Sequence, residues 1–260
     1  MMENPVLWKE LKARLRSRQT APVRVAVGGV VLLFVLSCYY FAIIYFGGIG
    51  GNGGTETARQ WWEVGVWLQA IVIWLLCPAL AANAVTQEKE QQTWEMLVFT
   101  LLSPAEILVG KLIARLVPMV AILASFLPYM VYCLAYGGAK VSEFLVTYAV
   151  FAIWIVFLTT VSLFMSWAFR RTAAAIAMSY MVLFALTIGT GLIEATLTAG
   201  QPDLDSPIIW LNPVRILKAL TDPMDPRATQ VMLMSHMTYL GAAAFLFWRM
   251  VRRFRAFAIE

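Results

Sequence analysis

A charged stretch of this chain reads Val85-Thr86-Gln87-Glu88-Lys89-Glu90-Gln91-Gln92-Thr93-Trp94-Glu95-Met96-Leu97, and Ser103-Pro104-Ala105-Glu106-Ile107-Leu108-Val109-Gly110-Lys111 follows it. It separates two apolar runs that are each long enough to cross a membrane. Apolar side chains recur at helical spacing at Trp94, Leu97, Val98 and Leu101, and polar ones repeat that spacing on the opposite side at Glu88, Gln91, Gln92 and Glu95. The pattern predicts a two-faced helical hinge; the alternative is an ordinary solvated loop.

The end of this stretch has the pattern of a helix start. In Ser103-Pro104-Ala105-Glu106, serine takes the N-cap position, proline the first helical position, and glutamate the position that completes a capping box. A new helix is therefore expected to begin at about Pro104 and to run back into the membrane.

The composition indicates a polytopic membrane protein. The chain has 260 residues, of which 61% are hydrophobic and 13% charged, and its mean hydropathy is +0.74. These values exclude an ordinary soluble protein and leave little chain for a separate soluble domain. The cysteines Cys38, Cys77 and Cys133 all fall in apolar runs, where they predict small buried side chains rather than disulfides or a metal site.

Six apolar runs reach the length of about 20 residues that a membrane span needs. They lie at roughly 25–46, 63–86, 107–136, 144–169, 172–193 and 229–250. The fold class expected is therefore all-α, with a six-helix transmembrane domain over 25–250. The coupling hinge falls at about 87–106, and a longer external segment at about 194–228.

The distribution of basic residues predicts the orientation of the chain. Fifteen of the 20 Lys and Arg residues fall at the first terminus, the hinge and its exit, Arg170-Arg171 and the tail, and five fall in the other connections. By the positive-inside rule this asymmetry places both termini and the hinge in the cytoplasm. Residues 251–260 are then a basic cytoplasmic tail. No cleavable signal sequence is expected before the first span.

The first 24 residues predict an amphipathic helix that lies in the cytoplasmic interface of the membrane. Asn4 is the expected cap and Pro5 the first helical residue. An apolar face with Trp8 is opposed by basic residues that approach anionic lipid. The predicted interfacial anchor residues are Trp8, Lys9, Lys12, Arg14, Arg16 and Arg18. Nucleic acid is not an expected partner of a basic helix beside a membrane span.

A similar cap precedes the last span. Asn212-Pro213 begins a short pattern in which Val214, Leu217 and Leu220 share a face, with basic residues between them. It predicts an interfacial or re-entrant helix, and the alternative is a surface loop.

The residues that are missing exclude several mechanisms. Apart from residues close to their ends (Glu63, Lys111 and Arg249), the predicted spans hold only Arg115 and His236 as charged or imidazole side chains, so a proton- or sodium-coupled transporter is not expected. His236 is expected to be a neutral imidazole bonded to a neighbouring helix. Gly110-Lys111 lacks the earlier glycine of a phosphate-binding loop, and no catalytic or metal-ligand set is present. The chain is therefore expected not to be an enzyme and to bind no cofactor or metal itself.

The hinge residues also resemble a known family. Glu88-Lys89-Glu90, Thr93-Trp94-Glu95-Met96-Leu97 and Ser103-Pro104 through Gly110-Lys111 resemble the cytoplasmic loop of ABC-2 type transporter permeases, and Asn4 to Leu11 is similar to their first segment. The resemblance covers essentially the whole chain. Two residues depart from the family pattern: Gln92 stands where a glycine is common, and Leu101 where the family often has a turn proline.

The resemblance implies a permease subunit of an ATP-driven transporter, expected to be an exporter. Two separate ATPase subunits would bind ATP and magnesium and dock on the hinge, and a second permease, identical or related, would complete the pathway. Localisation in the inner membrane of a bacterium is implied. The transported substrate stays open. The expected coupling residues are Glu88, Glu90, Trp94, Glu95, Leu97, Ser103, Pro104 and Glu106.

Within that set, the carboxylates are expected to contact the ATPase. The apolar side chains would either brace the hinge against the permease itself or fill a groove on the partner. The rival function is a structural or regulatory membrane subunit that transmits force from an ATPase and transports nothing. Polar residues in the spans, such as Gln69, Thr159 and Thr187, would either line a pathway or bridge helices.

Overall fold

The computed structural model describes residues 53–94, 103–197, 210–222 and 228–254. Within these ranges the chain is helical and contains no strand, which confirms the predicted all-α class. The first predicted span, the N-terminal helix with its anchor residues, and the tail beyond 254 lie outside the described residues. Five helical stretches are long and apolar enough to cross a membrane.

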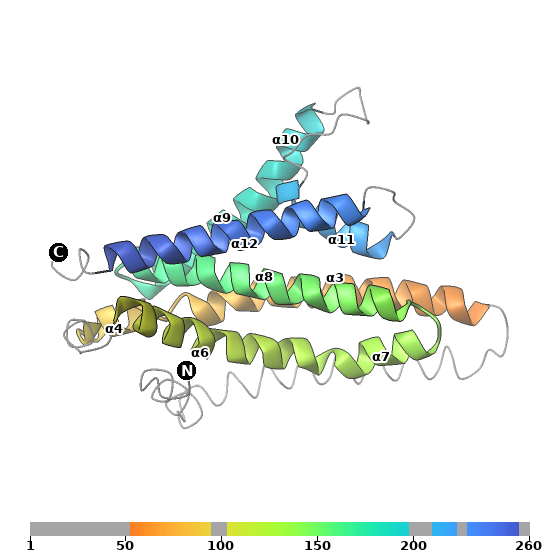
Figure 1. Cartoon of the computed structure of the whole chain (residues 1–260), viewed down its shortest axis with the longest axis horizontal. Helices are drawn as coiled ribbons and strands as arrows, with labels where there is room; N and C mark the ends of the chain where they lie inside the picture. The colour runs from red at the N-terminus through yellow and green to blue at the C-terminus, as the bar shows by residue number, and fades with distance from the viewer. Residues whose placement is uncertain (1–52, 95–102, 198–209, 223–227, 255–260) are drawn as a thin grey trace.

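The structure describes ten helical elements within these ranges. They are α3 (Gly53–Ala81), α4 (Thr86–Glu90), α6 (Pro104–Ser125), α7 (Leu127–Ala135), α8 (Val141–Ala168), α9 (Thr172–Phe184), the π-helix η1 (Ala185–Gly189), α10 (Thr190–Leu197), α11 (Pro213–Thr221) and α12 (Ala228–Arg253). The long helices run roughly side by side, and α4, the start of α9 and the end of α12 lie at one end of the bundle (Figure 1). We call this end the hinge end.

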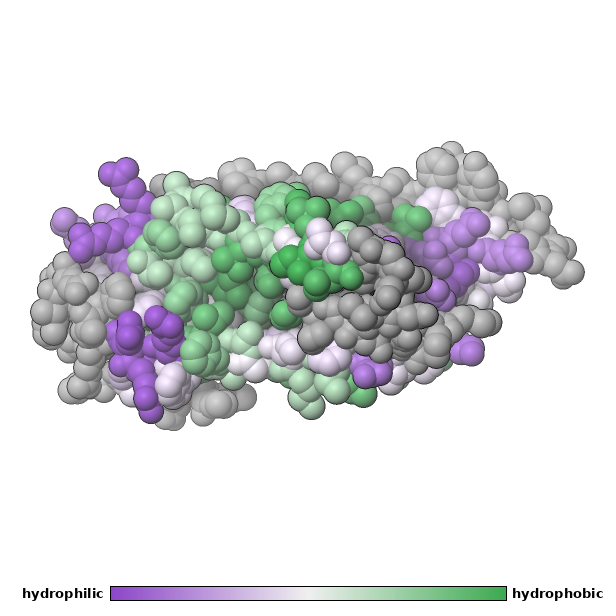
Figure 2. Space-filling view, turned by 90° about the horizontal axis from the view of Figure 1, so that it is seen from above, coloured by the Kyte–Doolittle hydropathy of each residue, from purple (hydrophilic) through white to green (hydrophobic). Residues whose placement is uncertain are grey.

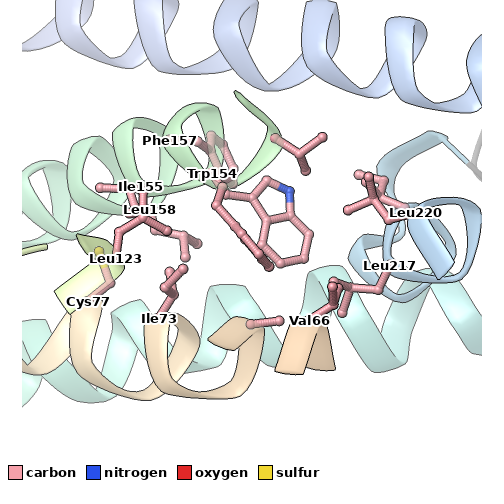
Figure 3. Packing of buried hydrophobic residues seen from close by; sticks show 14 of the residues in the cluster. Val66, Ile73, Cys77, Leu123, Trp154, Ile155, Phe157, Leu158, Leu217 and Leu220 are labelled. Atoms are coloured by element: carbon pink, nitrogen blue, oxygen red, sulfur yellow. The ribbon is translucent and has the colours of Figure 1, made fainter. Parts of the chain in front are cut away.

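Helix α8 is the centre of the bundle. It packs against α3, α6, α9 and α12, and it is the most buried of the five candidate spans. Its Trp154 lies between Val66 and Ile73 of α3 and Leu217 and Leu220 of α11, and all five side chains are buried (Figure 3). The bundle is therefore a layer of helices around one strongly apolar helix.

The surface has the distribution of polarity that a membrane imposes. Figure 2 shows hydrophobic residues across the middle of the visible face and hydrophilic residues toward both ends. Exposed Ile71 and Leu75 on α3 and Met237 on α12 would be unfavourable in water, but they match an apolar solvent. The structure thus fits an integral membrane protein that crosses the bilayer several times.

The predicted third span is two helices. The run predicted over 107–136 is divided into α6 and α7, which meet at Phe126. Pro128 lies in the first turn of α7, where it has no N–H to continue the hydrogen bonds of α6. A hydropathy pattern registers the apolar run but not this interruption.

Helix α3 begins ten residues before the predicted start of its span at residue 63, so part of the connection before that span is helical. Arg59 can lie within this helix near the membrane because its charge is paired. Its guanidinium lies 3.4 Å from Glu63 one turn on and 2.5 Å from Glu143 of α8, and it donates to the Thr221 carbonyl of α11 at 2.6 Å. These bonds join three helices at the end opposite the hinge end.

The connection between α7 and α8 depends on two glycines. Gly137 has a φ of 77°, a conformation that L side chains rarely adopt. A Cβ on Gly138 would lie 2.4 Å from the Ala58 carbonyl oxygen of α3. The Gly137-Gly138 pair therefore lets the turn pass directly against α3.

The predicted fifth span comprises α9, η1 and α10. The Thr187 and Thr190 hydroxyls donate to carbonyls of the preceding turn, Leu183 and Leu186, next to the π-helical segment. Beyond this segment α10 diverges from α12 (Figure 1). The expected external segment from 194 accordingly begins inside α10, whose Glu194 pairs with Arg215 of α11.

Helix α11 begins with the predicted cap. The Asn212 side chain accepts a hydrogen bond from Val214 N at 2.9 Å, and Pro213 occupies the first turn. Ile216, missing from the predicted face, is buried beside Leu217. The helix packs on α3, α8 and α12, so a helix is confirmed and the alternative of a loop is wrong, while its interfacial or re-entrant position stays a prediction.

Polar side chains inside the spans are mostly satisfied by their own helix. Thr160 and Ser162 donate to the carbonyls four residues earlier, at 2.8 Å each. His236 likewise contacts the Met232 carbonyl of its own helix, so the expected bond to a neighbouring helix is wrong. Contacts between helices exist as well: Cys77 Sγ lies 3.3 Å from the Thr159 hydroxyl.

The hinge is not one continuous helix, and here the sequence-based prediction is wrong. Helix α4 ends at Glu90, and Gln92 has a φ of 57° in the left-handed region. Thr93 N donates to the Glu88 carbonyl at 2.9 Å and Gln92 N to the Lys89 carbonyl at 3.2 Å. These two bonds form a Schellman motif, which ends a helix and usually places glycine at the left-handed position.

Replacement of Gln92 by glycine is expected to stabilise this helix end. A non-glycine residue in the left-handed region costs about 1 kcal/mol, which glycine does not incur. The amides of Gln92 and Thr93 should exchange with solvent more slowly in Gln92→Gly, as measured by hydrogen exchange. Gln91→Gly is the matched control, because Gln91 has a φ of −85° and glycine there should speed exchange. Faster exchange in Gln92→Gly would contradict the assignment.

Candidate functional site: the hinge end of the bundle

The start of α6 is fixed by the predicted capping box. Ser103 Oγ accepts a hydrogen bond from Glu106 N at 3.3 Å, and the Glu106 carboxylate accepts one from Ser103 N at 2.8 Å. The two residues satisfy each other's backbone N–H groups, and Pro104 needs no partner at the first helical position. The prediction for Ser103, Pro104 and Glu106 as a helix start is confirmed.

A fully buried ammonium lies one turn or two into α6. The Lys111 side chain has no exposed surface, and its Nζ lies 2.7 Å from a Glu88 carboxylate oxygen. It also donates to the Ala84 carbonyl at 3.0 Å, in the turn just after the end of α3. Arg115, one turn further on, donates to the Leu80 carbonyl at 3.4 Å. Both cations therefore lie where the α3 macrodipole is negative.

Lys89 and Glu90 bind the two helices on either side of the Arg170-Arg171 turn. Lys89 Nζ donates to the Phe169 carbonyl at 3.2 Å and to the Trp167 carbonyl, at the end of α8. The Glu90 carboxylate accepts from Thr172 N at 2.6 Å, at the start of α9. The cation thus lies at a helix C-terminus and the anion at an N-terminus, which is the favourable arrangement for both dipoles.

Hydroxyl groups complete this polar network. Ser166 Oγ of α8 accepts from Val85 N at 2.8 Å and from Thr86 N at 3.0 Å. The Thr172 hydroxyl of α9 donates to Thr86 Oγ1 at 2.9 Å, and Thr86 donates to the Ala82 carbonyl at 3.2 Å. The turn between α3 and α4 is therefore hydrogen-bonded to α8 and α9. We call the polar contacts of Thr86, Glu88, Lys89 and Glu90 the hinge network.

An apolar cluster lies beneath the network. Trp94 is 5% exposed, and its ring centroid lies 5.1 Å from that of Phe254, just past the end of α12. The Lys89 ammonium lies 5.9 Å from the same tryptophan ring. The remaining buried members are Ala84, Val85, Ile107, Leu108, Leu163, Trp167 and Met250. Of the two expectations for Trp94, the structure supports bracing against the permease itself.

The predicted site residues thus have different surroundings. Glu88 is partly buried and faces Lys111, whereas Glu90 is exposed and holds the start of α9. Glu95 and Leu97 lie outside the described residues. Outward-facing polar side chains on and beside α4 include those of Gln87, Glu90, Gln91, Gln92, Thr93, Arg170 and Arg171.

Sequence reasoning missed Lys111, Ser166 and Thr172 as members of the site. Lys111 carried a signal, because a lysine in the first turns of an apolar helix needs a partner. Ser166 and Thr172 carried none, since a hydroxyl in a membrane helix usually bonds its own backbone. In the described ranges, no group of three or more His, Cys, Asp or Glu side chains is placed to hold a metal ion.

Comparison with known protein families agrees with this architecture. The family model described as ABC-2 family transporter protein matches residues 4–251. The chain belongs to the ABC-2 transporter family. The match spans nearly the whole sequence and includes every element of the hinge network, so this ABC-2 chain is a membrane permease subunit of an ABC transporter and not itself the catalytic subunit. No curated protein matches the chain.

The cap of α6 should contribute measurably to stability. Loss of an N-cap hydroxyl costs about 1 kcal/mol, so Ser103→Ala should lower the free energy of unfolding by that amount. Ser125→Ala is the matched control, because the Ser125 hydroxyl only donates to the Ala121 carbonyl within the same helix. Denaturant titration in mixed micelles measures both. Equal effects of the two variants would show that the capping box adds nothing.

The Glu88–Lys111 pair should respond asymmetrically to mutation. Glu88→Ala leaves a buried ammonium without its carboxylate and should cost about 3 kcal/mol or more. Lys111→Met should cost less, because Glu88 is partly exposed to solvent. The double variant should therefore be more stable than Glu88→Ala alone in the same titration. Glu63→Ala is the control: the Glu63 side chain is 41% exposed and pairs with Arg59, so its loss should lower the free energy of unfolding by about 1 kcal/mol or less. A double variant less stable than Glu88→Ala would contradict the pairing.

Proposed function

We propose that this ABC-2 permease is driven as an exporter by two separate ATPase subunits, which bind and hydrolyse ATP with magnesium and push on the hinge. A second permease, identical or related, would complete the transport pathway. The hinge would face the cytoplasm of a bacterial cell, with the protein in the inner membrane. The observation that carries the proposal is the hinge network, because three consecutive residues of α4 are bonded to three different helices.

The hinge network connects α4 directly to three other helices, so a movement of α4 can be transmitted to them. Glu88 is paired with Lys111 of α6, Lys89 bonds the end of α8, and Glu90 bonds the start of α9. A displacement of α4 would break these directional bonds unless the three helix ends moved with it. Movement imposed on a helix of five residues would in this way reach three of the long helices.

The roles that we propose for the hinge residues differ from the expectation that all of the hinge carboxylates contact the ATPase. Glu88 and Trp94 face the permease, so their proposed role is to position α4. Direct contact with the ATPase would come from the outward-facing Gln87, Gln91 and Thr93, with Glu90 at the edge. Glu95 and Leu97 are kept as proposed coupling residues from the family resemblance alone.

A crosslinking experiment tests the docking surface. In a variant without native cysteines, Gln91→Cys should crosslink to the co-expressed cognate ATPase. Lys218→Cys, exposed on α11 at the opposite end, is the control and should not. A stable complex in which Gln91→Cys never crosslinks, while Lys218→Cys does, would place the ATPase elsewhere.

Coupling is tested separately from docking, with an accessibility reporter in α9. Ala173→Cys is exposed at the start of that helix, and ATP should change its labelling rate in the complex. Combination with Glu88→Ala and Lys111→Met should leave ATPase binding intact and abolish this change. An ATP response as large as that of the reporter alone would remove the hinge network from the mechanism.

A further inference from the structure

Helix α12 carries a continuous apolar face that nothing in the described part of the chain covers. Its buried side, with Tyr239, Ala243 and Met250, packs toward the bundle. The opposite side is open: Met237 is 71% and Trp248 48% exposed. We call this face the α12 stripe; its large members are Leu233, Met237, Leu240, Phe245 and Trp248.

The stripe has the length of a membrane hydrocarbon core and ends in positive charge. At about 1.5 Å per residue, Leu233 and Arg252 are about 28 Å apart along the helix, against a core of about 30 Å. Arg249, Arg252 and Arg253 are exposed at its end. No carboxylate in the described ranges pairs with any of the three. Their charges are thus available to an anion from outside the bundle.

One arginine is held in place by the stripe itself. The Arg252 guanidinium carbon lies 4.1 Å from the centroid of the Trp248 ring, a cation–π contact. Phe245, with its ring centroid 6.0 Å from that of Trp248, extends the aromatic surface toward the membrane centre. A guanidinium fixed over a ring loses less freedom when it binds, and its planar donors match the oxygens of a phosphate.

The middle of the stripe has a notch at Gly241. A Cβ built at this glycine would meet no other atom within 4 Å. Gly241 and the exposed Ala244 lie on the same face as Trp248, between Met237 and the aromatic pair. A narrow, flexible chain of methylene groups can lie in such a depression.

We propose that the α12 stripe binds an anionic phospholipid, with the headgroup phosphate at Arg252 and Trp248 and an acyl chain over Gly241. The occupant follows from the charge complementarity of three arginines that no carboxylate of the described ranges pairs, and from the apolar face that continues from them. The proposal is independent of the ATPase and of the hinge network.

Native mass spectrometry of the full chain tests the selectivity. The protein is purified with equal amounts of phosphatidylglycerol and phosphatidylcholine that carry the same acyl chains. The wild type should retain phosphatidylglycerol in excess, and Arg252→Gln should reduce that excess about fivefold, as expected for one basic residue at an anionic surface. Lys218→Gln, which removes an exposed charge from the opposite end, should leave it unchanged. Equal retention of the two lipids by the wild type, or an unchanged excess in Arg252→Gln, would overturn the proposal.

Two further arms identify the ligand. Gly241→Leu fills the notch without an internal clash and should lower phosphatidylglycerol occupancy, while circular dichroism confirms an unchanged fold. Millimolar inorganic phosphate should not displace the lipid. Displacement by phosphate would assign the arginines to a free-anion site and contradict the lipid. A dimer that Gly241→Leu dissociates would assign the stripe to a second copy of the chain, again against the proposal.

Discussion

The ammonium of Lys111 has no exposure to solvent, and this burial constrains where the neighbouring helix ends can lie. Removal of such a charge from water costs several kcal/mol unless a close anion and further hydrogen bonds replace the water. Glu88 and the Ala84 carbonyl supply them, and both belong to the segment that follows α3. The end of α3, the position of α4 and the first turns of α6 are therefore fixed relative to one another by one buried charge.

The same requirement recurs at the other helix ends. A helix that ends near a membrane leaves backbone groups that lipid cannot satisfy. Here the carbonyls at the end of α8 receive Lys89, and an N–H at the start of α9 receives Glu90. The alternation of acid, base and acid in this motif matches the order in which α4 passes a helix C-terminus and a helix N-terminus. Its charges serve the permease first, before any partner is considered.

The features that sequence could predict are those contained within a few residues. Ser103 with Glu106, and Asn212 with Val214, form caps over three residues, and both were found from the pattern alone. The partners of Glu88 and Glu90 could not be found, because Lys111 and Thr172 meet them only when separate helices pack. The turn at Gln92 was missed for another reason: helical periodicity places side chains around an axis and does not register a positive φ. The departure from the family's usual glycine was the available signal.

Polar and apolar contacts at the hinge end differ in the motions that they permit. Ion pairs and hydrogen bonds weaken when the two groups move apart by a short distance or turn out of line. The hinge network therefore holds α4 against α6, α8 and α9. The contact of Trp94 with Phe254 is apolar and has no direction, so the end of α12 can slide across the tryptophan and keep most of its burial. Of the contacts that α4 and Trp94 make at the hinge end, the one with Phe254 is therefore the most tolerant of a small displacement. The hinge network thus fixes Trp94 relative to α4, and Phe254 is the contact across which a small movement costs least.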